Sequence, residues 1–326
     1  MKKFDFNEYK TPFKANKYII APSEHEGDYN AQGVDCPFVF YHKGCWFLMH
    51  VGFDGRSYQT ALSCSDTING DYRFYDLILK RGDGNGWDST GAAGCYILSE
   101  QDINRRRVLK KWKGKYWMLY HSYPFEGYEE GPASIGLAYC EDETLKDWKR
   151  LKEPILTSDK NIAWEAGGLY KEAIVEKDGL FYMFYNAKTA SDDWNEQIGM
   201  ATSEDLVHWT RCKNNPLLRN GNGYDAKFVS DPFILQNEDL YIMYYFVFNG
   251  KNARGGIGYS YDLRNWTKCD QLTLDIGDPG AIDDVHAHKS CVIEENGTLY
   301  HFYCAVDSNH IRGISYATND RSKLSV

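Results

Sequence analysis

Hydrophobic and polar positions along this chain follow a repeating unit: an apolar run, a tight turn containing Gly or an acidic residue, and an aromatic-rich strand. Within each unit, apolar and polar residues alternate with a period of two, which is typical of β-strands. No long apolar period of 3.6 residues occurs, so few helices are expected. The unit recurs five times, in residues 37–50, 108–120, 173–185, 232–245 and 291–303.

A second motif follows each unit and predicts two further strands. Its three clearest copies each end in a tryptophan that opens the last strand, namely Trp148, Trp209 and Trp266. Four antiparallel strands in each of five repeats, without helical crossovers, predict an all-β fold, a five-bladed β-propeller. A pair of β-sandwiches is the alternative, but it does not account for five phased copies. We expect a single domain over residues 1–326, with a closing strand near 17–21 and blades at roughly 30–80, 95–157, 165–218, 226–275 and 283–320.

Composition narrows the class of protein. The 326 residues include 37 Lys and Arg against 46 Asp and Glu, a formal charge of −9 that argues against nucleic acid as a partner. No apolar stretch is long enough for a transmembrane helix, so no membrane partner is expected. The charged start of the chain shows no secretory signal, and the nine scattered cysteines contain no C-x-x-C pair. We therefore expect reduced core thiols and a cytoplasmic protein.

Ionisable residues stand just before the apolar run of every repeat. The innermost strands of a propeller converge on its axis, so these residues are expected to line one funnel. Buried charges are costly unless they are paired, and a purely structural hub would be lined by small apolar residues. This convergence of charge is the strongest functional signal in the chain, and it comprises Asp35-Cys36, Arg105-Arg106-Arg107, Tyr170-Lys171-Glu172, Ser230-Asp231 and His288-Lys289.

Two of these positions contain Asp-Pro-like motifs, Asp35-Cys36-Pro37 and Ser230-Asp231-Pro232, and a third reads Ala287-His288-Lys289-Ser290. With the repeat phase over roughly residues 15–320, they resemble the five-bladed propeller glycosidases of glycoside hydrolase families 43, 62, 32, 117 and 130. The family 43 counterpart of the third motif is Gly-His-Asn-Ser. The Glu-Gly-Pro of that family is absent, and Glu172-Ala173-Ile174 stands in its place.

This resemblance implies three catalytic carboxylates: Asp35 as general base, Glu172 as general acid, and Asp231 as the residue that orients and tunes the acid. The chemistry of the residues agrees, since glycoside hydrolysis needs one protonated and one ionised carboxyl group. A third carboxylate nearby raises the pKa of the acid. Such trios usually give inversion of configuration. Alternative acids are Glu165 and, as in family 117, a histidine of the fifth repeat, either His286 or His288.

Further residues are candidates for binding the sugar. Aromatic platforms suit the CH-rich faces of sugars, which makes Trp87, Trp164 and Trp194 candidates, although packing between blades is the alternative. Trp87 and Trp164 each precede an acidic residue, and these recurring aromatic-acid pairs form either a structural element of the loops or the rim of a pocket. Cations at the axis either neutralise the carboxylates or bind a uronate, sulfate or phosphate group. The polar candidates for substrate binding are Arg106, Lys171, His286, His288 and Lys289.

No cofactor is predicted to be required. The family resemblance implies at most one structural divalent cation, calcium, near the axis, with His288 as a possible ligand. His286 and His288 also form a His-x-His pair whose rings lie on one face of a strand, a workable pair of metal ligands.

We therefore expect a glycoside hydrolase that removes a terminal sugar from a small oligosaccharide. Action at a chain end is inferred from the long segments 80–104 and 121–133, which are placed to wall off one end of a groove. The alternatives are a glycoside phosphorylase, in which inorganic phosphate replaces water, and a non-catalytic carbohydrate-binding propeller. The identity of the sugar and the oligomeric state cannot be read from the sequence.

Overall fold

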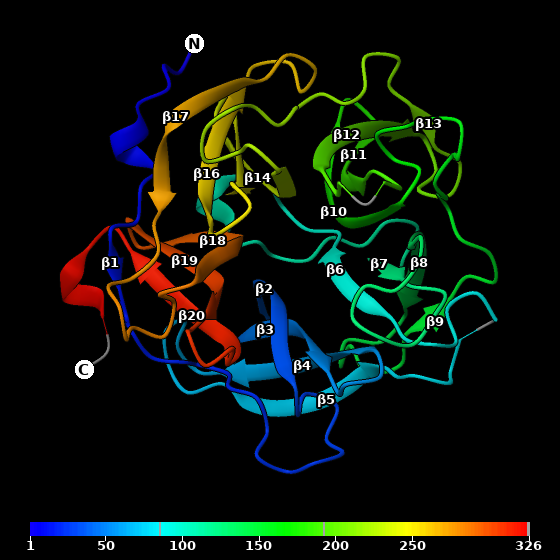
Figure 1. The fold of residues 1–326 in the computed structure, drawn as a ribbon, viewed down its shortest axis with the longest axis horizontal. Coiled ribbons are helices and arrows are strands. Elements are labelled where there is room, and N and C mark those ends of the chain that lie inside the picture. Colours follow the sequence, from blue (N-terminus) through cyan, green and yellow to red (C-terminus); the bar gives the residue numbers. More distant parts are fainter. Residues whose placement is uncertain (85, 192, 325–326) are drawn as a thin grey trace.

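β-Strands make up almost all of the regular structure in the computed structural model, which describes residues 1–84, 86–191 and 193–324 (Figure 1). The helical elements in that part are the short 3-10 helices η1 (Phe6–Glu8), η2 (Ile103–Arg105) and η3 (Arg321–Lys323). None of them has the length and apolarity needed to span a membrane. The prediction of an all-β chain with few helices is confirmed.

Consecutive strands pair antiparallel in runs. The first two runs are separate four-stranded sheets, and a third sheet joins the other twelve strands. Within that third sheet, neighbouring runs meet only through single parallel pairs, Glu196 with Phe228 and Ala253 with His286. Figure 1 shows the runs arranged around the middle of the molecule, with the first strand of each run facing it. The runs are β2 (Gly33–His42), β3 (Cys45–Phe53), β4 (Tyr58–Ser65) and β5 (Arg73–Leu79); β6 (Ala93–Ile97), β7 (Tyr116–Ser122), β8 (Ser134–Cys140) and β9 (Lys149–Arg150); β10 (Gly168–Lys177), β11 (Leu180–Lys188), β12 (Glu196–Ser203) and β13 (Thr210–Arg211); β14 (Phe228–Asn237), β15 (Leu240–Phe248), β16 (Ala253–Ser260) and β17 (Thr267–Leu274); and β18 (His286–Glu295), β19 (Thr298–Val306) and β20 (Arg312–Thr318).

The N-terminal segment joins the last run. Strand β1 (Phe13–Lys14) pairs antiparallel with β20, and further along Ile20 forms an isolated bridge with Ile314. Of the closing strand predicted near 17–21, Ile19 and Ile20 form backbone hydrogen bonds with Ile314, whereas the regular strand β1 lies before it. Between these two points the Tyr18 ring packs against Gly313, where a Cβ atom would lie 2.6 Å from the ring, and its hydroxyl donates to the Ile282 carbonyl. The segment thus follows β20 without forming a continuous ladder.

The second repeat differs from its sequence-based prediction. Its inner strand is β6, Ala93–Ile97, whereas the predicted inner segment after residue 107 forms only isolated bridges. The residues between β6 and β7 form a long loop that contains η2. Cys95 therefore lies at the middle of the molecule, and the arginines at 105–107 lie in this loop instead.

A β-bulge interrupts every inner strand at the same level. The register shifts between Asp35 and Phe38 in β2, and the other four inner strands shift at Gly94/Tyr96, Tyr170/Glu172, Ser230/Phe233 and His288/Cys291. A bulge adds an unpaired residue and redirects its side chain. In four of these bulges the extra residue has a positive φ of 53–61°: Cys36, Lys171, Asp231 and Lys289.

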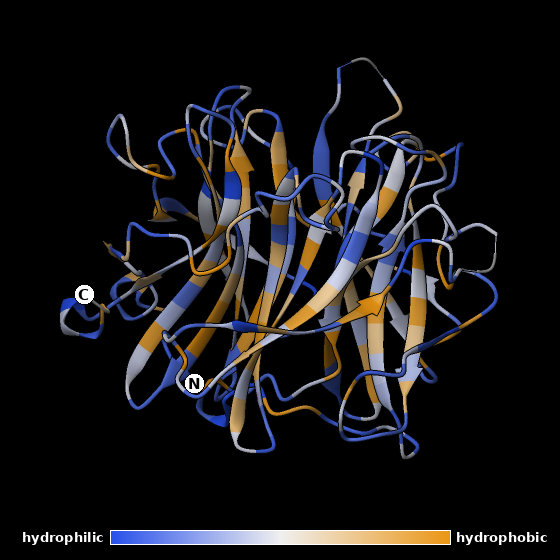
Figure 2. Cartoon of the chain, turned by 90° about the horizontal axis from the view of Figure 1, so that it is seen from below, coloured by the Kyte–Doolittle hydropathy of each residue, from blue (hydrophilic) through white to orange (hydrophobic). Residues whose placement is uncertain are grey.

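Aromatic side chains fill the sheets and the spaces between them. Figure 2 shows apolar positions alternating with polar ones along the strands, the period-two pattern that predicted them. Among the recurring tryptophans, Trp148, Trp209 and Trp266 each donate an indole N–H to the carbonyl of a leucine three residues earlier, at 2.7–3.0 Å. Their assignment to the structure of the repeat is confirmed.

Candidate active site

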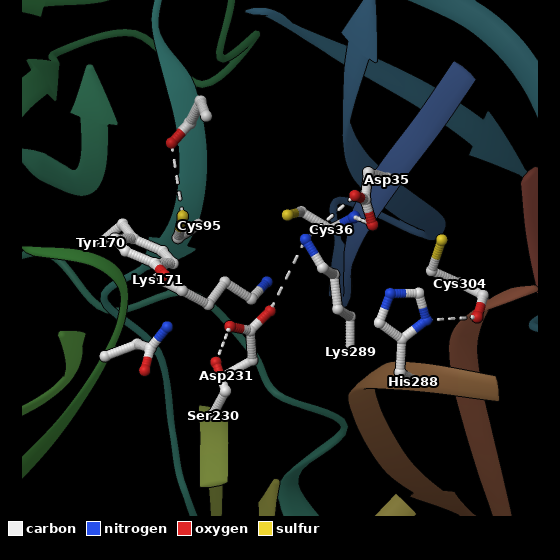
Figure 3. Close-up of polar contacts among 12 residues, drawn as sticks. Asp35, Cys36, Cys95, Tyr170, Lys171, Ser230, Asp231, His288, Lys289 and Cys304 are labelled. Atoms are coloured by element: carbon white, nitrogen blue, oxygen red, sulfur yellow. Dashed lines mark hydrogen bonds and ion pairs between the residues drawn. The ribbon is translucent and has the colours of Figure 1, made fainter. Parts of the chain in front are cut away.

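The bulge residues bring side chains from five distant points of the chain together. We call Cys36, Cys95, Lys171, Asp231 and Lys289 the axial cluster; Figure 3 shows them pointing toward one another from β2, β6, β10, β14 and β18. All of the cluster residues except Lys289 are at most 5% exposed. The predicted convergence of charge thus occurs. The β-bulges that produce it could not be read from the apolar pattern.

Asp35 lies beside this cluster as a paired, buried carboxylate. Its Oδ2 accepts hydrogen bonds from Lys289 Nζ at 3.0 Å and from Arg312 Nη1 at 2.8 Å. Burial alone would raise the pKa of Asp35, but the Lys289 and Arg312 charges hold it well below its ordinary value. Asp35 is therefore ionised, and both cations are engaged with it.

Asp231 occupies the opposite side of Lys289, whose Nζ lies 3.9 Å from its Oδ2. The Ser230 hydroxyl donates to Asp231 Oδ1 at 2.9 Å. Burial raises the pKa of Asp231, and the charges of Lys289 and Lys171 oppose that effect. Asp231 reaches a cavity next to the axial cluster.

This cavity has a volume of about 220 Å³. Ligand pockets of drug-sized molecules span about 300–1,000 Å³, so the cavity is of a size for one sugar ring. Its lining combines aromatic and charged side chains, which suit the CH-rich face and the hydroxyl groups of a sugar. The lining residues are Tyr128, Glu129, Tyr170, Trp194, Glu196, Phe228, Asp231, Phe246, Phe248, Ala253, His286, His288, Lys289 and Arg312.

Two glutamates in this lining form a carboxylate pair that the sequence reasoning missed. Glu196 opens β12 and is 3% exposed. Burial, and then the negative charge of Glu129, raise its pKa to about 7. Burial likewise raises the pKa of Glu129, against the charges of Lys289 and Lys188. Glu196 therefore titrates near neutral pH, and the pKa of Glu129 is shifted in the same direction; acid–base catalysis of glycoside cleavage uses one protonated and one ionised carboxyl group.

Hydrogen bonds distinguish the two members of the pair. The Tyr170 hydroxyl donates to Glu196 Oε1 at 2.6 Å, and Asn186 Nδ2 donates to Oε2 at 2.9 Å. Such donors favour the ionised form of Glu196. Glu129 lies in the loop between β7 and β8, with φ at 55°.

The loop that carries Glu129 is held by neighbouring runs. Lys188 Nζ donates to the Glu129 carbonyl at 3.2 Å, and Arg312 Nη1 donates to the Tyr128 hydroxyl at 2.9 Å. The Arg56 carbonyl accepts from the Gly127 N–H at 2.7 Å. These contacts position the Glu129 backbone over the cavity.

Glu172, the predicted acid, is not among the residues that line the cavity. It is 1% exposed, and its Oε1 lies 3.9 Å from His121 Nδ1, with Cys95 also nearby. Burial raises the pKa of Glu172 to about 8. The group is thus protonated at neutral pH, but it faces an interior contact instead of the cavity.

His286 and His288 both reach the cavity. Burial lowers the pKa of His286 to about 4 and that of His288 well below its ordinary value, so both rings are neutral. The Nδ1 atom of His286 accepts from the Ala253 N–H, and the Nδ1 atom of His288 donates to the Cys304 carbonyl. Calcium binds about six to eight oxygen ligands; the cavity that His288 lines offers the carboxylates of Glu129, Glu196 and Asp231 together with the Phe246 ring and a lysine.

Three predicted binding residues lie elsewhere. Arg106 forms an ion pair of 2.6 Å with Glu295, at the end of β18 that is remote from His286. The loop after β6 places it there. Trp87 stacks on Tyr120, and Trp164 stacks on Tyr185, with centroid distances of 5.8 and 6.0 Å. None of the three is among the residues that line the cavity.

The aromatic-acid pair Trp164-Glu165 has a structural role. Trp164 packs over Gly199, where a Cβ atom would lie 2.4 Å from the indole ring. The neighbouring Glu165 is fully buried and ion-pairs with Arg211 at 2.8 Å, and it accepts from the Tyr185 hydroxyl at 3.4 Å. Because its carboxylate is committed to these contacts, Glu165 is not a candidate acid.

Other predicted residues do reach the site. His286, His288 and Lys289 line the cavity, and Lys171 stands in the axial cluster behind it. Trp194 lines the cavity with the Lys188 ammonium 4.2 Å from its ring centre. All nine cysteines are free thiols, as expected.

Comparison with known proteins identifies the class to which this fold and this site belong. A solved complex of BT0996 with RGII is 33% identical, with a TM-score of 0.85 over 97% of this protein and 93% of that one. A second structure, described as "Glycoside hydrolase", is 31% identical, with a TM-score of 0.83 over the same shares. The fold is thus that of a propeller glycosidase.

The family itself follows from the sequence. The model of the glycosyl hydrolases family 32 N-terminal domain matches residues 102–280, more than half of the chain, and the protein belongs to this family. A beta-1,2-mannobiose phosphorylase of Thermoanaerobacter sp. (strain X514) is 29% identical over 38% of this chain and 45% of its own length. The chain spans less than half the length of the curated relatives it matches.

Proposed function

We propose that this protein is a five-bladed propeller glycoside hydrolase that removes a terminal sugar, with Glu129 and Glu196 as its two catalytic carboxylates. The observation that carries the proposal is the pairing of these two raised-pKa carboxyl groups in one sugar-sized cavity. Each of the antiparallel runs described above would be one blade. The axial cluster would form the floor of the site.

The roles follow from the hydrogen bonds. Glu196 accepts from Tyr170 and Asn186 and is favoured as the ionised base or nucleophile. Glu129 would then hold the shared proton and give it to the departing oxygen as the general acid. Protonation of Glu129 removes the charge that raises the pKa of Glu196, so the pair binds one proton before the second.

A neighbouring cleft supports action on a chain end. It has a volume of about 310 Å³ and shares Trp194 with the catalytic cavity. The small cavity would hold the terminal sugar, and the cleft would receive the rest of the glycan. Its lining residues are Gly131, Pro132, Ala166, Gly167, Lys188, Thr189, Ala190, Ser191 and Trp194.

Chemical rescue tests these roles. A panel of aryl glycosides with good and poor leaving groups is assayed with the wild type, Glu129→Gln and Glu196→Gln. Loss of the acid should leave turnover of the best leaving groups nearly intact and abolish that of the poor ones. Loss of the base or nucleophile should affect both, with partial recovery by azide. Full activity of either variant on a poor leaving group would refute the assignment.

A glycoside phosphorylase is the second candidate. The 29% identity to a mannobiose phosphorylase and the two cations at the cavity, Lys289 and Arg312, favour it. Against it, both cations are already paired with Asp35. Assays with and without inorganic phosphate, followed by identification of free sugar or sugar phosphate, separate the two reactions.

A further inference from the structure

A buried group of three potential metal ligands shares one residue, Cys95, with the axial cluster. Cys95 is the bulge residue of β6, His121 lies on the adjacent strand β7, and Glu172 lies on β10 of the next run. Their exposed fractions are 3%, 5% and 1%. One donor atom from each lies within 4.8 Å of the other two. The proposed catalytic pair does not include any of these residues.

The distances suit a shared ion. Cys95 Sγ lies 3.2 Å from His121 Nδ1, and that nitrogen lies 3.9 Å from Glu172 Oε1. Bonds of about 2.0–2.3 Å from zinc to sulfur, nitrogen and oxygen place ligand atoms about 3–4 Å apart. An ion would displace the hydrogen bond of 3.3 Å from the Lys171 N–H to His121 Nδ1 and those of the Cys95 thiol to His121 Nδ1 and to the Ala93 carbonyl.

The carboxyl group of Glu172 provides an independent indication. Both of its oxygens are buried, and apart from the Cys95 thiol beside it neither meets a hydrogen-bond donor among the described residues. Buried polar groups in folded proteins are nearly always paired with protein, water or an ion. This carboxyl group is directed at the sulfur and the imidazole nitrogen, where an ion would satisfy it.

The donor set selects the class of ion. Thiolate and imidazole ligands suit zinc and related transition ions, whereas calcium and magnesium take oxygen ligands. Two ammonium groups are close by, but Lys289 is paired with Asp35 and Lys171 lies near Asp231. A thiolate and a carboxylate would balance the charge of one divalent ion.

We propose that Cys95, His121 and Glu172 bind one structural transition-metal ion, with zinc as the probe, that links two neighbouring runs of the sheet. The site is distinct from the sugar cavity, so its role is stability and not chemistry. The axial position predicted for calcium at His288 is a different place with different ligands.

The full-length protein is treated with a chelator, dialysed, and reconstituted with zinc or cobalt. We expect one zinc per chain by elemental analysis, a rise in the melting temperature on zinc addition, and a thiolate-to-cobalt charge-transfer band. Cys95→Ala and Glu172→Gln should lose these responses, whereas the control Cys304→Ala, another buried cysteine, should keep them. Zinc uptake by the wild type no greater than that of Cys95→Ala, or equal loss in Cys304→Ala, overturns the proposal. If the variants do not fold, the wild-type cobalt spectrum decides, and a spectrum without the thiolate band overturns it.

Discussion

Replacing Glu196 by Gln is expected to remove a pH-dependent loss of stability. Glu196 is 3% exposed, and burial, followed by the charge of Glu129, raises its pKa from 4.5 to about 7. Because the folded-state pKa exceeds the unfolded one, its contribution to stability is complete below about pH 4.5 and is lost as the pH rises through about 7. A difference of about 2.5 in pKa, at about 1.4 kcal/mol for each pH unit, corresponds to about 3 kcal/mol.

Urea unfolding of the wild type and Glu196→Gln at about pH 5 and about pH 8 measures this term. Between those values the wild type should lose about 2.5 kcal/mol of unfolding free energy more than the variant does. Glu204→Gln, which changes an exposed glutamate, is the matched control and should follow the wild type. Equal pH dependence in the wild type and Glu196→Gln would refute the reasoning, because the surroundings of Glu196 would then not raise its pKa.

Other residues give further tests. Trp164→Ala should lower the unfolding free energy by about 3–5 kcal/mol while leaving the KM of the folded fraction unchanged; a selective rise in KM would return this tryptophan to the sugar site. Lys188→Met, which removes the donor to the Glu129 carbonyl, should lower kcat about tenfold or more, and wild-type kcat would show that the loop needs no such contact. Arg106→Ala should leave turnover unchanged, and a loss would contradict its placement. Asp35→Asn should lower the unfolding free energy by about 3–5 kcal/mol, since it leaves two cations unpaired. It should also move the acid limb of the pH–rate profile to lower pH. An acid limb at the wild-type pH would show that Asp35 does not influence the electrostatics of the cavity.

Much of the fold could be predicted because it depends on burial. Period-two patterns such as Phe181-Tyr182-Met183-Phe184 report which face of a strand is covered, and the recurring Trp209 marks the phase of the repeat. The second repeat misled the prediction, since 108–120 has an apolar run but β6 supplies the inner strand. Only the pairing of β6 with β7 distinguishes the two, and that is a long-range property.

The site was predictable only where its residues lie on inner strands. Asp231 and Lys289 could be found because they precede apolar runs at fixed phase. Glu129 lies in a loop whose conformation depends on donors from distant runs, so no periodicity marks it. Gly127 and Gly131, both with positive φ, were the available local signal of a tight loop there. Glu196 opens β12, and only the cavity shows what it faces.

Asp35 and the pair of Glu129 and Glu196 have different electrostatic roles. Lys289 and Arg312 lower the pKa of Glu129 from a distance, yet their closest contacts are with Asp35. A buried anion with two cations at hydrogen-bond distance offsets part of their field, which would otherwise act in full to ionise the pair in the cavity. Among the described residues, neither Glu129 nor Glu196 forms an ion pair. Asp35 is therefore best understood as the counterion that leaves Glu129 able to keep its proton, which makes it indispensable without placing it at the reacting bond.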